Sequence, residues 1–159
     1  MNDSLTDVQT AICSNQADLF EYIARTYTFN TFVKFVPAFM NSEFCRTQWD
    51  VPYSRYQFDL IDENLDFLMP ELKQTMHFVQ ASDDDRIFDP DTANWIGFTY
   101  RQLQILTKIP SRQLIKSISF NDLCNAYPGL HTVSEEMAAR RLISDRLTIR
   151  QPSMKDKIS

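Results

Sequence analysis

Apolar residues recur at helical spacing, three or four positions apart, along most of this chain. The first series predicts one long helix, or two short ones, over about residues 4–27. Asn30 is placed to cap the next helix, and Pro37 inside that segment should kink or restart it. A further helix, capped by Ser54, should end before Pro70.

The second half of the chain begins with a strong helix-start signal. Asp89 offers a capping carboxylate, Pro90 suits the first helical position, and Asp91 adds negative charge at the positive end of the helix dipole. The helix predicted over residues 90–108 is apolar except for a narrow polar strip. That strip consists of Asn94, Arg101, Gln104 and Lys108. Such a helix should lie at the centre of its part of the fold.

Shorter helices are expected after a turn near residue 109. Ser119 is placed to cap one of them, and the Pro-Gly pair at 128–129 should end it. Thr132 and Glu135 have the spacing of a capping box and should open the last helix. The last dozen residues lack apolar periodicity.

These elements predict an all-α fold, an irregular helical bundle of about six to eight helices. They form one domain or two small lobes sharing a core. An acidic N-terminal helical lobe would span residues 1–80, an acidic linker 81–91, a C-terminal helical lobe 92–147 and a flexible tail 148–159. The linker is the clearest break in the apolar pattern.

Composition narrows the function classes. The chain has two glycines, Gly97 and Gly129, where average usage of ~7% would give about 11. Phosphate-cradling glycine loops are therefore excluded. Three cysteines without metal or redox spacing suggest buried thiols in a reducing cytoplasm. No apolar run approaches the ~20 residues of a membrane span, so we expect a cytoplasmic protein with no membrane partner.

Charge is divided unevenly along the chain. Residues 1–90 contain 15 Asp and Glu against 6 Lys and Arg, whereas residues 91–159 contain 6 against 10. This asymmetry suits a protein that meets a basic partner with its acidic half, or one whose halves attract each other. Ordinary solvated surface is an equally good interpretation.

The segment WIGFTYRQLQILTKIPSRQL, residues 95–114, has half the pattern of a DNA-reading helix-turn-helix. Gln104 occupies the position of a small residue, and Lys108 that of the turn glycine. The candidate DNA contacts, which share the exposed side of the second helix, are Arg112, Gln113 and Lys116. The net positive charge of residues 91–159 is small for a protein that must contact DNA phosphates. A packed helix hairpin is therefore the preferred interpretation.

No catalytic or metal-binding constellation stands out. His77 and His131 lie far apart, and neither has a Cys, Asp or Glu at ligand spacing. No Ser lies in a glycine elbow, and no Cys has an identifiable base. We therefore expect no enzyme activity, no catalytic residue, no metal and no cofactor. An enzyme with a site split around Tyr56, Arg101 and His131 is a third alternative without a defined chemistry.

Two clusters combine tyrosine with arginine, the residue types enriched at interface hot spots. The protein-interface candidates are Tyr53, Arg55 and Tyr56 in the first cluster, Tyr100 and Arg101 in the second, and His131. An alternative for Arg101 is a structural ion pair with a carboxylate of the other lobe.

The run ANWIGFTYRQLQILTKIPSRQLIKS, followed by YPGLHTVSEEMA, resembles a family of small uncharacterised bacterial all-α proteins found in toxin-antitoxin-like gene sets. The shared pattern falls on Trp95, Gly97, Tyr100, Arg101, Thr107, Ser111, His131 and Thr132. The family favours glycine where this chain has Lys108. In the first half, MNSEFCRTQWDVPYSRYQ is also similar. The resemblance implies an interaction or neutralising protein.

The sequence thus predicts a non-enzymatic protein-protein interaction module, in its specific form an antitoxin-like neutralising protein of a bacterial toxin-antitoxin-type system. Its expected partner is another protein, a toxin encoded nearby. The alternative is a DNA-binding transcriptional regulator with a degenerate helix-turn-helix at about 95–118.

Overall fold

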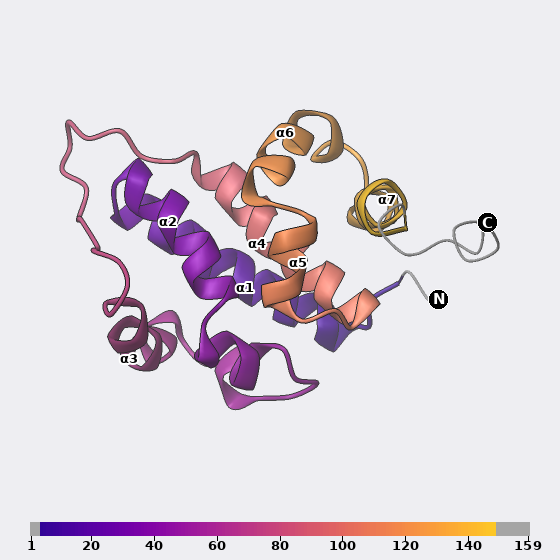
Figure 1. The fold of residues 1–159 in the computed structure, drawn as a ribbon, viewed down its shortest axis with the longest axis horizontal. Coiled ribbons are helices and arrows are strands. Elements are labelled where there is room, and N and C mark those ends of the chain that lie inside the picture. The colour runs from indigo at the N-terminus through magenta and orange to yellow at the C-terminus, as the bar shows by residue number, and fades with distance from the viewer. Residues whose placement is uncertain (1–3, 149–159) are drawn as a thin grey trace, which may run out of the picture.

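The computed structural model describes residues 4–148 and confirms the all-α class (Figure 1). Its α-helices are α1 (Asp7–Thr26), α2 (Phe29–Met40), α3 (Ile61–Leu72), α4 (Pro90–Thr107), α5 (Ser111–Ser117), α6 (Phe120–Leu130) and α7 (Glu135–Leu142). The shorter turns are η1 (Cys45–Trp49) and η3 (Ile143–Thr148), which are π-helical, and η2 (Arg55–Gln57), which is a 3-10 turn. Within residues 4–148 there is no strand, but one isolated antiparallel bridge joins Tyr27 to Gln80. No helix in that range is long and apolar enough to cross a bilayer.

Helices α1 and α4 form the most extensive helix pair and lie at the centre of the molecule. A capping box between Thr6 and Gln9 starts α1, which then runs without a break. Gly97 lets α4 approach α1 closely, because a Cβ at this position would lie 2.9 Å from the Phe20 ring and 3.0 Å from the Ala17 Cα. One of the two glycines of the chain therefore serves helix packing.

An aromatic-rich core joins the two halves of the chain. Phe20 of α1 makes edge-to-face contacts with Phe35 and Phe39 of α2, at ring-centroid separations of 5.5 and 5.4 Å. Phe120 of α6 packs edge-on against Phe32 of α2 at 6.1 Å. Elements on both sides of the acidic segment 81–91 thus bury their apolar faces in one core.

Two helix starts expected from the sequence are confirmed. The Asp89 carboxylate accepts a hydrogen bond from the Thr92 N–H at 2.9 Å, and Pro90 occupies the first helical position of α4. Ser119 starts α6 in a capping box with Asp122. Both caps satisfy N–H groups that the first turn of a helix leaves without an intrahelical acceptor.

Other helix starts differ from the expected ones. Thr28, not Asn30, caps α2, and Ser134, not Thr132, caps α7. Ser54 caps only the short turn η2, and α3 begins seven residues after Ser54, at Ile61. Several capping residue types stand close together at these points, and the packing of the following apolar residues selects among them.

The prolines at 37, 70 and 128 lie inside α2, α3 and α6, where the sequence suggested a break. Apolar residues on both sides of each proline pack into the core, for example Val36 and Phe39 in α2 and Leu68 and Leu72 in α3. Their burial offsets the backbone hydrogen bond that each proline removes. The expected tail, 148–159, lies outside the described residues except at its first position.

Candidate functional site

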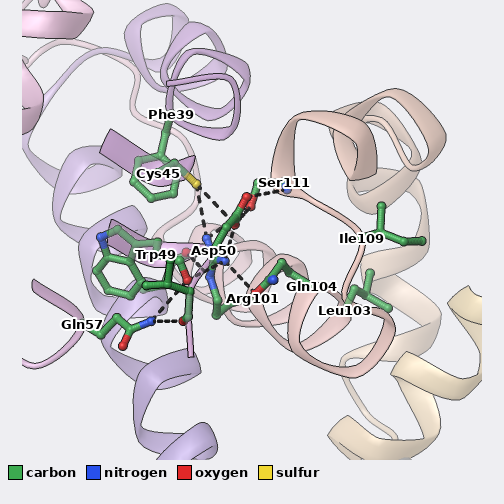
Figure 2. A network of polar contacts seen from close by, with 12 residues as sticks. Phe39, Cys45, Trp49, Asp50, Gln57, Arg101, Leu103, Gln104, Ile109 and Ser111 are labelled. Carbon is green, nitrogen blue, oxygen red and sulfur yellow. Dashed lines mark hydrogen bonds and ion pairs between the residues drawn. The ribbon is translucent and has the colours of Figure 1, made fainter. Parts of the chain in front are cut away.

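Arg101 of α4 is fully buried and forms an ion pair across the core (Figure 2). Its Nη1 lies 2.6 Å from Oδ1 of Asp50, which directly follows η1, and donates a second hydrogen bond to the Trp49 carbonyl at 3.1 Å. The structure thus supports the ion-pair alternative for Arg101, because its partner carboxylate comes from the first half of the chain.

The other guanidinium contacts bring four elements together. They reach Gln16 Oε1 in α1 (2.8 Å), Gln104 Oε1 in α4 (3.0 Å), Ser111 Oγ in α5 (3.3 Å) and Cys45 Sγ in η1 (3.4 Å). Gln16 also donates to the Gly97 carbonyl at 2.9 Å. Within residues 4–148, every buried side-chain nitrogen and oxygen has a hydrogen-bond partner. A satisfied network of this kind fixes the relative positions of the elements that contribute to it.

Asp50 has a second role at the start of α5. Its carboxylate accepts hydrogen bonds from the N–H and the hydroxyl of Ser111, the first residue of that helix. The turn before α5 passes through Lys108, whose φ of 61° lies in the left-handed region that favours glycine. The turn geometry expected of a glycine therefore forms with a lysine in its place.

The titratable groups around Arg101 suit a structural role. Burial raises the pKa of the Cys45 thiol to about 11 and that of Cys13 to about 12, so both stay protonated near neutral pH. Burial disfavours the charge on Arg101, but Cys45 and Asp50 more than offset this effect, and its pKa lies above the ordinary value. Within residues 4–148, no three His, Cys, Asp or Glu side chains meet as a metal site.

Side-chain amides hold the segment after η1 in one conformation. Gln57 is buried and donates to the carbonyls of Trp49 and Val51 at 3.2 and 2.9 Å. Asn15 of α1 donates to the Gln57 carbonyl at 2.7 Å. Asn64 of α3 accepts from the Trp49 indole at 3.1 Å and donates to the Tyr56 carbonyl at 2.9 Å. The segment is therefore tied to α1, to η1 and to α3.

This segment and α3 expose large apolar side chains. The set, which we name the 53–67 surface, comprises Tyr53 (72% exposed), Phe58 (48%), Leu60 (72%) and Phe67 (57%). Tyr56 is half-buried between Phe44 and Phe67, at centroid distances of 5.1 and 5.2 Å. Arg55 lies over the Tyr56 ring and forms an ion pair with Asp59 at 3.0 Å.

A groove of about 510 Å³ runs between α1 and the Phe58 end of this surface. Its lining residues, which define the acidic groove, are Asn15, Asp18, Tyr22, Phe58, Asp59, Leu60, Ile61 and Asp62. Partial burial, together with the nearby charge of Glu21, raises the pKa of Asp18 above its ordinary value. The groove combines apolar side chains with three carboxylates, a composition that attracts cationic and apolar groups together.

The interface candidates predicted from the sequence separate in the structure. Arg55 lies over the Tyr56 ring at the 53–67 surface, and Tyr53, two positions before Arg55, is exposed. Tyr100 and Arg101 are fully buried, so in this structure neither side chain is exposed for contact with a partner. Tyr100 instead donates its hydroxyl to the Ile118 carbonyl at 2.7 Å.

His131 lies away from the first cluster. It ends α6, which Figure 1 shows on the opposite side of α4 from α3. Its exposed ring stacks on Tyr127 at 4.2 Å, and Tyr127 packs edge-on against Trp95. An enzyme site uniting Tyr56, Arg101 and His131 is therefore not assembled.

The candidate DNA contacts lie on α5 as expected, but in an acidic setting. Gln113 and Lys116 are exposed, and Arg112 pairs with Glu43 at 3.2 Å. Glu71 lies next to Glu43, because its carboxylate accepts hydrogen bonds from the Glu43 and Phe44 N–H groups. Two carboxylates beside the second helix weaken its attraction for DNA phosphates.

Sequence reasoning missed Asp50, Cys45, Gln16 and Ser111 as partners of Arg101. The available signal was an arginine on the narrow polar strip of a mostly apolar helix, because an arginine buried there needs a counter-charge. Comparison of the chain with protein-family models, with curated proteins and with solved structures gives no match.

Proposed function

We propose that this chain is a non-enzymatic interaction module that binds a basic protein through the 53–67 surface and the acidic groove. The observation that carries the proposal is the exposure of Tyr53, Leu60 and Phe67, which are 72%, 72% and 57% exposed. Single exposed apolar residues are ordinary, whereas contiguous apolar patches are typical of interaction sites. Here Phe67 packs against Tyr56, and Phe58 and Leu60 line one groove.

The way this surface is held favours tight binding. Hydrogen bonds from the buried residues Gln57 and Asn64 fix the backbone that carries the exposed side chains. A preorganised surface loses less conformational entropy on association than a mobile one. Tyrosine at its edge adds the residue type that dominates interface hot spots.

Charge defines the partner class. Asp18, Asp59 and Asp62 line the acidic groove, and the first 90 residues carry a large acidic excess. Opposite charge on a partner speeds association and penalises acidic competitors. The partner expected is a protein segment whose apolar side chains are flanked by Lys or Arg.

The antitoxin-like form of this proposal identifies the partner as a toxin encoded nearby. A module that covers a basic apolar surface blocks any function that depends on that surface. The resemblance to proteins of toxin-antitoxin-like gene sets motivates this form, and the acidic groove supplies a physical means for it.

The test is a calorimetric titration of the chain with the protein product of the adjacent gene. Leu60→Ala should weaken binding about tenfold or more, because it removes most of the apolar area that this 72% exposed side chain would bury against the partner. Met137→Ala, a change at a 42% exposed side chain on α7, is the matched control and should leave the affinity unchanged. Absence of binding, or equal weakening by both variants, would overturn the proposal.

Two further experiments test the contribution of the groove carboxylates to binding and the relief of the partner's toxicity. Asp62→Asn should slow association and reduce its dependence on salt, whereas Asp84→Asn, at an exposed position of the 81–91 segment, should not. Co-expression should relieve toxicity of the partner, and Leu60→Ala should reduce that relief. Binding without relief would retain the interaction module and refute the antitoxin-like form.

The alternative is a DNA-binding regulator, and one observation favours it. The α4–α5 turn has a left-handed residue, Lys108, at the position where a helix-turn-helix favours glycine. A pull-down divided into nuclease-treated and untreated halves separates the two functions. A protein partner that survives nuclease supports the module; retention of nucleic acid that is abolished by Arg112→Ala with Lys116→Ala supports the regulator.

A further inference from the structure

A second groove, of about 600 Å³, lies at the start of α2. Its walls are the first turn of α2 and the extended segment between α3 and α4, which passes this end of α2 in Figure 1. The groove is lined by Thr28, Phe29, Asn30, Thr31, Lys34, His77, Val79, Asp85 and Arg86. None of these residues lines the acidic groove.

The lining of this second groove carries more positive than negative side chains, whereas the first 90 residues as a whole are acidic. The first 90 residues contain only 6 Lys and Arg, yet two of them, Lys34 and Arg86, line this groove together with His77. Within residues 4–148, neither Lys34 nor Arg86 forms an ion pair, whereas Arg25, Arg46 and Arg55 each pair with a carboxylate.

The one acidic residue of the lining is already engaged. The Asp85 carboxylate accepts hydrogen bonds from the N–H and the hydroxyl of Ser82 at 2.8 and 3.0 Å. These hydrogen bonds lower the pKa of Asp85, so it stays ionised near neutral pH. Two cations and an imidazole therefore line this groove together with one carboxylate that is held by its own turn, and the positive end of the α2 dipole lies at the same groove.

Backbone hydrogen bonds build the two walls against each other. Thr28 donates its N–H to the Val79 carbonyl at 2.9 Å, and Phe29 donates to the Arg86 carbonyl at 3.0 Å. The Thr31 hydroxyl accepts from the Val79 N–H at 3.2 Å. The Arg86 guanidinium lies over the Phe29 ring, 3.9 Å from its centroid. The groove is thus a fixed feature of the fold, and a cation–π contact supports its arginine.

We propose that this groove binds the phosphate group of a small organic phosphate monoester. Lys34 supplies a point charge, Arg86 a planar fork of N–H donors, and His77 a further hydrogen-bonding nitrogen, all on the lining of one groove. A phosphate has several oxygens pointing in different directions and accepts from donors on both walls. The volume of the groove leaves room for a sugar-sized group attached to the phosphate.

The experiment is a heteronuclear NMR titration of the full chain with inorganic phosphate and, separately, with ribose 5-phosphate. Both probes should give saturable shifts of the backbone amides at residues 28–34 and 77–86. The sodium salts are matched in ionic strength with sodium chloride, so that general screening is removed.

Three variants decide whether the groove is responsible. Lys34→Gln and Arg86→Gln should each lower the affinity for both probes by about fivefold. This is the effect of losing one charge interaction near a protein surface. Lys73→Gln, at an exposed lysine outside the groove lining, is the matched control and should leave both affinities unchanged. All three positions are exposed, so the fold should be retained.

Absence of saturable shifts at residues 28–34 and 77–86, or equal weakening by all three variants, would overturn the proposal. Binding of inorganic phosphate without ribose 5-phosphate would overturn the monoester assignment. The proposal is independent of the protein-binding function, because Lys34→Gln changes no residue of the 53–67 surface or the acidic groove.

Discussion

At the scale of single residues, the account depends on Arg101 and its partners. A buried charge is tolerated only when a counter-charge and hydrogen bonds replace the water it has lost. Asp50 supplies the charge, and side chains from α1, α4, α5 and η1 supply the remaining contacts. The arginine therefore ties together the helix pair, the α4–α5 turn and the segment that leads to the 53–67 surface.

Removal of the arginine leaves Asp50 without its counter-charge. We expect Arg101→Met to lower the free energy of unfolding by about 3–5 kcal/mol, as measured by urea denaturation. If that variant does not fold, Asp50→Asn provides a milder break that keeps an acceptor. Arg112→Gln removes an exposed ion pair and should cost about 1 kcal/mol or less. Similar losses for Arg112→Gln and both network variants would contradict the role given to the buried pair.

Thiol reactivity reports the burial of the cysteines. Cys13 and Cys45 are fully buried, and burial raises their pKa values to about 12 and 11, whereas Cys124 is half-buried. A disulfide reagent at pH 8 should modify no more than one thiol in the folded chain, and all three in urea. Cys124→Ser should abolish the reaction in the folded chain. Rapid modification of two thiols before unfolding would contradict the structure.

At the scale of elements, local signals predicted some helix starts, and packing decided the rest. Asp89 with Pro90 could be identified from sequence because a cap and its helix are adjacent in the chain. The Arg101–Asp50 pair could not, because 51 residues separate the partners and several other carboxylates were available. Helix α2 continues past Pro37 because the residues around it are buried, which a local rule about proline does not include.

The two glycines give a matched test of helix packing. Gly97→Ala places a Cβ 2.9 Å from the Phe20 ring and should lower the free energy of unfolding by about 1–3 kcal/mol. Gly129→Ala meets no atom within 4 Å and should raise it by about 0.4–1 kcal/mol, because alanine has less freedom in the unfolded chain. Thermal and urea unfolding of both variants measures the difference. Equal effects would contradict the close α1–α4 contact.

The Asp89 cap gives a pH-dependent prediction. Hydrogen bonds from the Thr92 hydroxyl and N–H lower the pKa of Asp89 in the folded state. The stabilisation is therefore complete above the unfolded pKa of about 3.9 and is lost as the pH falls through the lower folded value. Asp89→Ala should cost about 1 kcal/mol at pH 7 and progressively less below about pH 4. Asp89→Asn, which keeps the cap, is the control, and a pH-independent cost for Asp89→Ala would contradict the ionised cap.

At the scale of the whole molecule, a central helix pair supports two surfaces of opposite charge. The all-α class followed from apolar spacing, and the acidic character of the first half followed from composition. Neither surface could be located from sequence, because each joins segments that are distant in the chain: α1 with residues 58–62, and α2 with residues 77–86. Only Tyr53, Arg55 and Tyr56 pointed toward the first of them.

The most direct test of the proposed binding function is hydrogen exchange of the chain, free and in complex with the adjacent gene product. The account predicts that backbone protection on binding falls on residues 53–67 and on the α1 residues of the acidic groove, around Asp18. Protection confined to α5 and α7, with residues 53–67 exchanging as in the free chain, would contradict it.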